Sequence, residues 1–197
     1  MGKLYYYYGT MSSAKSATLL MKAHQFESSG QKCLILKSTF DTRSNGTVKS
    51  RIGLEKECVL IHEDDKIDVI IRNYARLFNT KYVFIDEVQF LPKHMIKALW
   101  DVTRDKKFDI NVFCFGLKTD YMNQLFETSK ELFVYADYIE ELKSMCKCCK
   151  NKATTHLRIV DGQVVKSGDI FNVGDCTGEE RYVSVCQECY ECPPSNV

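Results

Sequence analysis

A short segment near the start of the chain has the residue types and spacing of a phosphate-binding loop. Residues 9–16 read Gly-Thr-Met-Ser-Ser-Ala-Lys-Ser and match the pattern G-x-x-x-x-G-K-[ST] at every fixed position except Ala14. In such a loop the backbone N–H groups surround phosphate oxygens, and the positive end of the following helix adds to the attraction. The chemistry expected here is binding of the phosphates of a nucleotide.

Two side chains of this loop have specific expected roles. Lys15 would reach the β- and γ-phosphates, and the Ser16 hydroxyl would bind Mg²⁺. The other residues expected to contact the phosphates are Gly9, Thr10, Met11, Ser12, Ser13 and Ala14. The alternative is a serine-rich turn that merely caps a helix, with Lys15 in solvent.

Ala14 is the one departure from the loop pattern, which has glycine at that position. If the backbone there needs a positive φ, the alanine Cβ costs on the order of 1 kcal/mol. If φ is negative, the replacement is almost free. The sequence leaves this question open.

A second group of chemically capable residues follows the apolar run at residues 83–85. Asp86 and Glu87 end this run. Enzymes with a phosphate loop place such an aspartate beside the loop, where it holds Mg²⁺. Glu87 would face elsewhere and could accept the proton of an alcohol that attacks the γ-phosphate. Acidic residues also end many strands simply because they face solvent. The phosphate loop about 70 residues earlier is what makes a role in Mg²⁺ binding and proton transfer more specific for this pair.

The chain has ten cysteines, and most of them gather in its last third. Two C-x2-C pairs are separated by 36 residues: Cys146 with Cys149, and Cys186 with Cys189. Two such pairs form a tetrahedral Zn²⁺ site, and four thiolates leave no open position, which indicates a structural metal. Cys148 and Cys192 are not part of this predicted set of zinc ligands. Reduced free thiols, or a disulfide in an oxidised sample, are the alternatives.

Composition excludes several classes of protein. Lys and Arg number 27 against 26 Asp and Glu, so the basic surplus of most nucleic-acid-binding proteins is missing. No apolar run reaches the roughly 18 residues that span a membrane, and the first residues lack the apolar core of a signal peptide. We therefore expect a soluble, cytoplasmic protein that binds neither nucleic acid nor membrane.

The elements that must position these residues alternate between short apolar strands and one-sided helices. Strands are predicted at residues 4–8, 33–37, 82–85 and 110–115, and helices at residues 16–28, 67–78 and 96–102. Buried strands separated by helices are typical of a mostly parallel sheet covered on both faces. The predicted fold class is therefore α/β, similar to other nucleoside triphosphatases that carry a phosphate loop.

The character of the chain changes after about residue 143, where cysteines, lysines and short strands replace the long helices. Asp161-Gly162 is a hairpin turn signal within this part. We predict a nucleotide-binding domain at residues 1–142, a small zinc-binding domain at residues 143–192, and a tail at residues 193–197.

These features together resemble the zinc-containing thymidine kinases found in many bacteria, animals and poxviruses, and the pattern is most similar to the bacterial members. The resemblance extends from about Leu4 to Tyr190. Further segments that match the family are Asp41-Thr42-Arg43, Ser50-Arg51-Ile52-Gly53, Asp86-Glu87-Val88-Gln89-Phe90, Gly116-Leu117 followed by Tyr121, and Arg181-Tyr182-Val183-Ser184-Val185-Cys186.

The resemblance implies transfer of the γ-phosphoryl group of ATP to the 5′-hydroxyl of thymidine, giving dTMP and ADP. Glu87 would be the general base, and Arg43 would stabilise charge on the transferring phosphoryl group. Lys15, Ser16 and Asp86 would bind phosphate and Mg²⁺, and Gln89 is also expected among the residues that bind ATP.

The resemblance also implies a nucleoside site covered by a lasso loop in the zinc-binding domain. The residues it implies at the nucleoside are Met11, Asp41, Leu117, Tyr121, Val173, Gly174 and Tyr182. Members of the family are typically homotetramers that dTTP inhibits, so both properties are expected here.

Two departures from the family pattern are visible besides Ala14. The segment at residues 173–180 is about three residues longer than usual, and His156 stands where the family varies. We expect a surface or packing role for His156. The alternative functions are a deoxynucleoside kinase of shifted specificity and a degenerate loop protein that binds nucleotide without turnover. A zinc-containing nucleic-acid binder is a third alternative, which the near-zero net charge disfavours.

Overall fold

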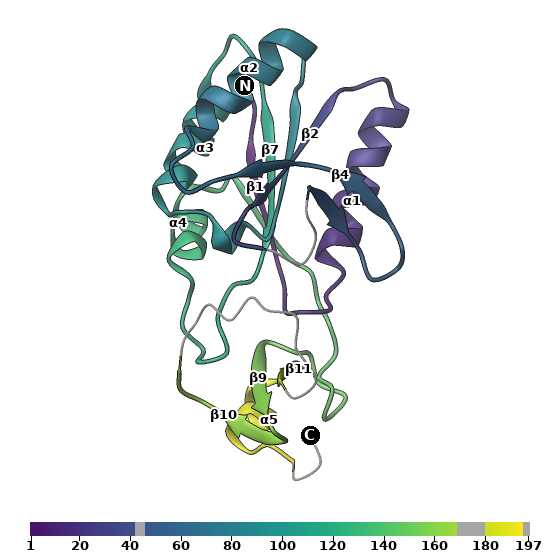
Figure 1. Cartoon of the computed structure of the whole chain (residues 1–197), viewed down its shortest axis with the longest axis vertical. Helices are drawn as coiled ribbons and strands as arrows, with labels where there is room; N and C mark the ends of the chain where they lie inside the picture. Colours follow the sequence, from purple (N-terminus) through teal and green to yellow (C-terminus); the bar gives the residue numbers. More distant parts are fainter. Residues whose placement is uncertain (42–45, 169–179, 195–197) are drawn as a thin grey trace.

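A parallel sheet and the helices that cover it form the larger part of the molecule (Figure 1). The computed structural model describes residues 1–41, 46–168 and 180–194. Within them the sheet is six-stranded, in the order β5-β2-β6-β7-β1-β8, and each neighbouring pair is parallel. Its strands are β1 (Leu4–Tyr8), β2 (Cys33–Ser38), β5 (Val59–Ile61), β6 (Tyr82–Asp86), β7 (Asn111–Gly116) and β8 (Tyr138–Glu141). The predicted α/β class is confirmed.

Helices cover both faces of this sheet (Figure 1). They are α1 (Lys15–Ser28), α2 (Ile67–Phe78), α3 (His94–Arg104) and α4 (Glu127–Tyr135). The last three pack side by side on one face, and α1 lies on the other. The predicted helix at residues 67–78 has the bounds of α2, whose apolar stripe buries Ile67, Ile71 and Ala75. Such a one-sided stripe is what a helix lying on a sheet requires.

Successive side chains of the strands serve the two faces alternately, as the pleat requires. On β7, Val112 and Cys114 belong to the apolar cluster beneath α2 and α3, whereas Phe113 and Phe115 belong to the cluster beneath α1. The ring of Phe115 stacks on that of Tyr7 from the neighbouring β1, with 4.8 Å between the ring centres. The tyrosine-rich β1 is therefore a packed core strand.

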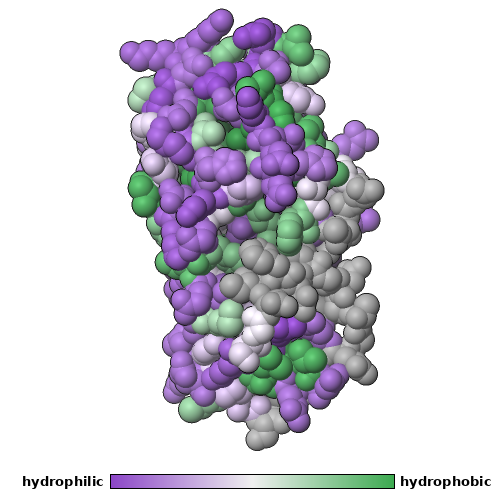
Figure 2. All heavy atoms as spheres, turned by 60° about the vertical axis from the view of Figure 1, so that its left-hand side comes forward, coloured by the Kyte–Doolittle hydropathy of each residue, from purple (hydrophilic) through white to green (hydrophobic). Residues whose placement is uncertain are grey.

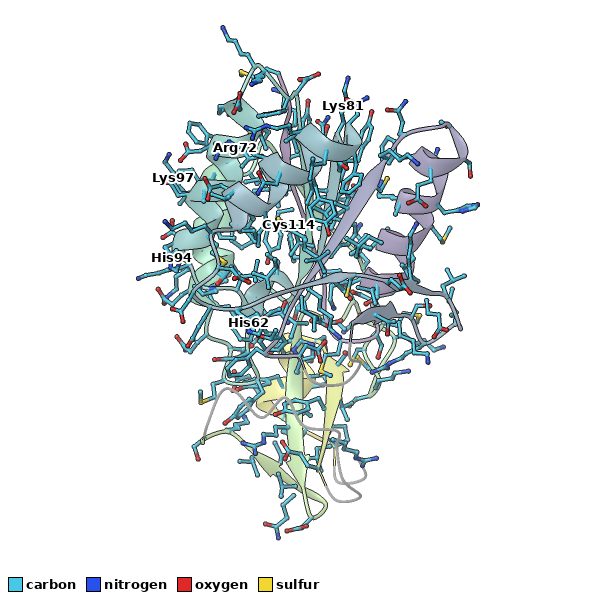
Figure 3. All side chains as sticks on the ribbon, turned by 45° about the horizontal axis from the view of Figure 1, so that its top comes forward. His62, Arg72, Lys81, His94, Lys97 and Cys114 are labelled. Atoms are coloured by element: carbon cyan, nitrogen blue, oxygen red, sulfur yellow. The ribbon has the colours of Figure 1, made fainter. Side chains whose placement is uncertain are left out.

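Cys114 illustrates how completely the centre is enclosed. Its side chain is fully buried, and burial raises the pKa of its thiol above the usual range. Figure 3 shows it at the middle of the sheet, while Arg72, Lys81 and Lys97 lie around it on the outside. On the face shown in Figure 2, hydrophilic side chains predominate and apolar ones are interspersed among them.

A smaller antiparallel sheet lies beyond the end of β1 that leads into the phosphate loop (Figure 1). In the described part of this region it is three-stranded, in the order β10-β9-β11, with α5 beside it. These elements are β9 (Thr155–Val160), β10 (Gln163–Val165), β11 (Glu180–Val185) and α5 (Gln187–Glu191). The predicted turn at Asp161-Gly162 joins β9 to β10, with positive φ angles of 51° and 75°.

Several short elements lack a strong sequence signal and were not predicted. They are the antiparallel ribbon of β3 (Thr47–Lys49) and β4 (Glu55–Glu57), the edge strands β5 and β8, and the 3-10 helix η1 (Val88–Phe90). The proposed domain boundary near Leu142 remains a prediction. Among the described residues, no helix is long and apolar enough to cross a bilayer.

Candidate active site

The phosphate loop connects β1 to α1 at the carboxyl edge of the parallel sheet. Gly9 begins it, and a Cβ at this position would lie 2.5 Å from the Leu142 carbonyl oxygen, so only glycine fits. Ala14 has φ 60° and ψ 26°, which is the left-handed conformation. Ala14 is exposed, and this conformation costs on the order of 1 kcal/mol for alanine. Ala14 therefore adopts a left-handed backbone conformation that glycine would adopt without this cost.

The Lys15 side chain is buried inside the loop. Its ammonium group donates hydrogen bonds to the carbonyl oxygens of Thr10 at 2.8 Å and Gly9 at 3.3 Å. The loop therefore encloses a positive charge at the start of α1, where the helix dipole also attracts anions.

Ser16 and Asp86 meet beside this loop. The Ser16 hydroxyl donates a 2.9 Å hydrogen bond to Oδ2 of Asp86, at the end of β6. The other oxygen, Oδ1, is buried and has no hydrogen-bond partner among the described residues. Burial raises the pKa of Asp86 and the negative charge of Glu87 adds to this, while the Ser16 hydrogen bond and Lys15 oppose it. A buried carboxylate oxygen beside a hydroxyl suits a hard cation such as Mg²⁺.

Glu87 is held by a side chain two residues further on. Its backbone is left-handed, with φ 48° and ψ 45°. Gln89 Nε2 donates to Glu87 Oε2 at 2.6 Å, and Gln89 Oε1 accepts from the backbone N–H of Leu117 at 2.9 Å. A Cβ at Gly116 would lie 2.5 Å from that Oε1, so glycine leaves room for the amide. The carboxylate is thereby fixed to the segment that follows β7.

Four cysteine thiols come together at one end of the small sheet. The Sγ atoms of Cys146, Cys149, Cys186 and Cys189 all lie within 4.8 Å of one another. The Sγ–Sγ distances are 3.6 Å for Cys149 to Cys186 and 3.7 Å for Cys149 to Cys189. These distances are too long for a disulfide and close to the roughly 3.8 Å edge of a tetrahedron with Zn–S bonds of about 2.3 Å. The cluster is therefore compatible with a structural zinc ion.

The Cys146 thiol has an environment that favours the thiolate. Burial would raise its pKa, but hydrogen bonds from the backbone N–H groups of Cys186, Cys148 and Cys149 outweigh burial and lower the pKa. A thiolate is the form that binds metal.

The small sheet contacts the phosphate loop directly. His156 on β9 accepts a 2.7 Å hydrogen bond at Nε2 from the backbone N–H of Met11. The Ser184 hydroxyl on β11 donates to the Met11 carbonyl oxygen at 2.6 Å. Burial lowers the pKa of His156 to about 3, helped by the charge of Lys15 and opposed by that of Glu87. The expected surface or packing role is incomplete, because this buried imidazole also bonds to the loop.

A further set of contacts anchors Tyr121, which is buried. The hydroxyl of Tyr190 donates to the Tyr121 carbonyl oxygen at 3.0 Å, and Arg158 donates to the Tyr121 hydroxyl at 3.3 Å. The rings of Tyr121 and Tyr182 meet edge to face at 6.2 Å between centres. Two of the residues expected at a nucleoside therefore face each other.

Comparison with known proteins places this geometry in a family. A family model described as thymidine kinase matches residues 2–190, which is nearly the whole chain. The chain belongs to the thymidine kinase family.

Individual relatives agree with this assignment to the thymidine kinase family. A thymidine kinase of Streptococcus agalactiae is 42% identical over 191 residues, covering 96% of this chain and 97% of that protein. One of Lactiplantibacillus plantarum is 41% identical over 195 residues, with 98% of each chain covered. One of Rhodopirellula baltica is 41% identical over 189 residues, covering 95% of this chain and 87% of that protein.

Of the residues expected from the thymidine kinase family, three lie outside the described part of the chain: Arg43, Val173 and Gly174. Most of the lengthened segment at residues 173–180 lies outside it too. Asp41 is described, and its carboxylate forms a buried ion pair of 3.1 Å with Lys37. Lys37 is the register partner of Asp86 in the sheet, so this pair adjoins the site. Lys37 was not predicted, because a single lysine in an apolar strand gives no specific signal.

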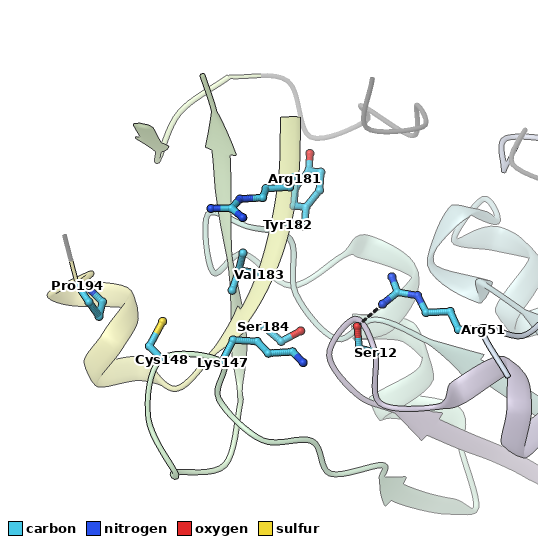
Figure 4. Close-up of a pocket in the computed structure, with 9 residues that line it drawn as sticks. All are labelled: Ser12, Arg51, Lys147, Cys148, Arg181, Tyr182, Val183, Ser184 and Pro194. Atoms are coloured by element: carbon cyan, nitrogen blue, oxygen red, sulfur yellow. Dashed lines mark hydrogen bonds between the residues drawn. The ribbon is translucent and has the colours of Figure 1, made fainter. Parts of the chain in front are cut away.

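A pocket of about 510 Å³ is lined by residues of β11, of the phosphate loop and of the segment at residues 147–148 (Figure 4). Arg51, Lys147 and Arg181 contribute cationic side chains to it, and Tyr182 lines it as well. Arg51, in a segment that matches the thymidine kinase family, donates a 2.5 Å hydrogen bond to the Ser12 hydroxyl of the phosphate loop. The surroundings of the loop are thus locally basic although the whole chain is nearly neutral.

Proposed function

We propose that this protein phosphorylates thymidine, transferring the γ-phosphoryl group of ATP to the 5′-hydroxyl and giving dTMP and ADP. The family match over residues 2–190 supports this proposal. The observation that carries it is the cluster of Ser16, Asp86 and Glu87 beside the loop, with Glu87 fixed by its 2.6 Å hydrogen bond from Gln89. This arrangement has a phosphate site, a cation site and a base at one sheet edge.

The loop binds the triphosphate of ATP through its backbone N–H groups and the start of α1. Lys15 leaves part of its present carbonyl contacts and turns its ammonium group to the β- and γ-phosphates. Ser16 and Asp86 would hold the Mg²⁺ that accompanies ATP, and this ion would supply positive charge to the phosphates. The partnerless Oδ1 of Asp86 supports this role.

Glu87 acts as the general base. The 5′-oxygen of the nucleoside forms a bond to the γ-phosphorus, the bond between this phosphorus and the bridging oxygen breaks, and ADP leaves with that electron pair. The hydroxyl proton passes to the Glu87 carboxylate. Gln89 holds the Glu87 carboxylate in place through its 2.6 Å hydrogen bond. Arg43 stabilises the charge of the transferring group.

The nucleoside lies between the loop and the small sheet. Met11, Leu117 and Tyr121 pack around the thymine, and Tyr182 covers it together with Val173 and Gly174. Asp41 completes the site. The edge-to-face contact of Tyr121 and Tyr182 brings two aromatic rings together, which supports a planar ligand beside this pair.

The remaining parts of the proposal concern cofactors and assembly. The four clustered cysteines hold a structural Zn²⁺ ion. The enzyme is a cytoplasmic homotetramer inhibited by dTTP, which family membership supports. Light scattering and a dTTP titration of the activity would test the last two points.

The first test of the function is ADP release with ATP, Mg²⁺ and thymidine, with a control lacking thymidine. We expect thymidine-dependent turnover that falls at least a hundredfold in Glu87→Gln, as removal of a general base does. The exposed Glu63→Gln is the matched control and should keep wild-type turnover. Intact ATP binding without turnover would instead favour the degenerate loop protein.

A second experiment separates thymidine from other nucleosides. The same assay is run with deoxyuridine, deoxycytidine and deoxyguanosine, and kcat/KM is compared. Thymidine should have the highest value. A higher value for another nucleoside would establish a deoxynucleoside kinase of shifted specificity.

A further inference from the structure

The peptide groups on either side of one loop residue are held from outside the loop. Met11 N–H donates to His156 Nε2 at 2.7 Å, and Met11 C=O accepts from the Ser184 hydroxyl at 2.6 Å. His156 and Ser184 are direct register partners on β9 and β11. Two side chains from one cross-strand pair therefore hydrogen-bond to both polar backbone groups of a single residue, Met11.

These two hydrogen bonds to Met11 are shielded from water. His156 is 3% exposed and Ser184 is 4% exposed, so solvent does not compete for either bond. Because Nε2 accepts the hydrogen bond from Met11, it carries no proton, so the imidazole is neutral and its own proton is on Nδ1. The nearby positive charge of Lys15 favours this neutral form. The acceptor that Met11 needs is therefore present across the physiological pH range.

The loop needs such outside restraint. Ser12 and Ala14 both have left-handed backbones, with φ angles of 65° and 60°. Each costs energy in a residue other than glycine, and such conformations persist where the surrounding structure over-determines them. Met11 directly precedes the first of these two residues. Holding its peptide groups limits the conformations open to the strained segment.

The restraint comes from the sheet that carries the cysteines. Ser184 lies two residues before Cys186, and its carbonyl oxygen accepts a 3.0 Å hydrogen bond from the backbone of Lys147, beside Cys146. One C-x2-C pair therefore follows β11 directly in sequence, and the other is joined to β11 by a backbone hydrogen bond. β11 is the strand whose Ser184 bonds to Met11. Any change in that sheet can reach the loop through this strand.

We propose that His156 and Ser184 are positioning residues that hold the phosphate loop in its nucleotide-binding shape, so that ATP affinity depends on this pair. Neither residue needs to touch the nucleotide. The proposal rests on the proposed function only in so far as the loop binds nucleotide phosphates.

The test is the Kd of Mg²⁺–ATP, measured by titration calorimetry without any nucleoside. Loss of a buried hydrogen bond should weaken binding about tenfold in His156→Ala. In His156→Gln the amide oxygen lies the same number of bonds beyond Cβ as Nε2 does, so affinity should return to within about threefold of wild type. His156→Asn has a comparable polar group but a shorter reach, and should resemble alanine.

Ser184→Ala provides an independent readout, because it leaves the imidazole in place. It should weaken ATP binding several-fold. The matched control is Thr154→Val, directly before β9, since the Thr154 hydroxyl has no hydrogen-bond partner among the described residues. Thr154→Val should bind ATP like wild type, and zinc content should be unchanged in all variants.

Two outcomes would overturn the proposal. One is wild-type ATP affinity in both Ser184→Ala and His156→Asn. The other is equal affinity in the glutamine and asparagine variants, which would indicate general packing. If His156→Ala does not fold, the comparison of glutamine with asparagine still decides. Failure of wild type to phosphorylate thymidine would overturn the proposed function and leave this ATP measurement interpretable.

Discussion

The side chain of Gln89 ties Glu87 to Leu117, donating to the carboxylate at 2.6 Å and accepting from the backbone N–H at 2.9 Å. The Leu117 N–H is only a donor, so it fixes which end of the amide faces Glu87. The orientation of the proposed base is therefore set through Leu117, the residue that directly follows β7.

The first prediction concerns this bridge. Gln89→Leu removes both hydrogen bonds, so we expect kcat to fall at least tenfold because the base is no longer oriented. Gly116→Ala should act in the same direction, since its Cβ would displace the amide. Steady-state kinetics with varied thymidine would measure this. The exposed Gln25→Leu is the control, and equal kcat in both glutamine variants would refute the bridge.

The second prediction concerns the left-handed backbone of Ala14. Ala14→Gly should raise the free energy of unfolding by about 1 kcal/mol, because glycine adopts φ 60° without strain. For a chain of this size the thermal midpoint should rise by about 2–4 °C. Ala98→Gly, inside α3, should instead destabilise by about 1 kcal/mol. Calorimetry of the two variants gives opposite signs if the conformation is as described, and the same sign if it is not.

The third prediction concerns the cysteine cluster. Cys189→Ser should lose zinc, destabilise the small sheet and weaken ATP binding, because the strand that grips Met11 belongs to that sheet. Cys192→Ser should keep about one zinc per chain, since Cys192 is exposed and is not a member of the cluster. Metal analysis and thermal unfolding distinguish the two. Zinc loss in the Cys192 variant would mean that the ligand set is different.

The fourth prediction concerns acid stability. The pKa of His156 is about 3 in the folded protein and about 6.5 in an unfolded chain, so the unfolded state binds more protons between these values. Stability is thus fully present above about pH 6.5 and is lost as the pH falls. From pH 7.5 to 5.5 this histidine should cost wild type about 1.4 kcal/mol.

Urea unfolding at the two pH values checks this expectation. His156→Gln should lack that part of the loss, whereas His94→Gln, at an exposed position on α3, should retain it. Identical pH dependence in His156→Gln and wild type would contradict a buried neutral imidazole.

Features encoded by nearby residues could be predicted from the sequence. The apolar spacing of α2 predicted its bounds, and the loop motif predicted a strand before it and a helix after it. The C-x2-C spacing selected the four cysteines that cluster, because two thiolates must face one ion from a single turn.

Features that depend on distant residues could not be predicted. The contacts of His156 with Met11 and of Gln89 with Leu117 join separate elements, and no local pattern marks them. The edge strand β8 also escaped prediction, because three of its four residues are exposed and it lacks an apolar run. The backbone conformation of Ala14 could not be predicted for a different reason. An alanine permits either a negative or a positive φ, and only the surrounding chain selects one of them.

The contact between Met11 and Ser184 spans 173 positions of the chain. During synthesis the loop therefore emerges well before the serine that bonds to it. A growing chain can therefore build the strand, loop and helix early while the loop still lacks its outside support. Full affinity for nucleotide should therefore arise only after Ser184 has folded back onto the loop, and a chain interrupted before this residue should bind ATP less tightly.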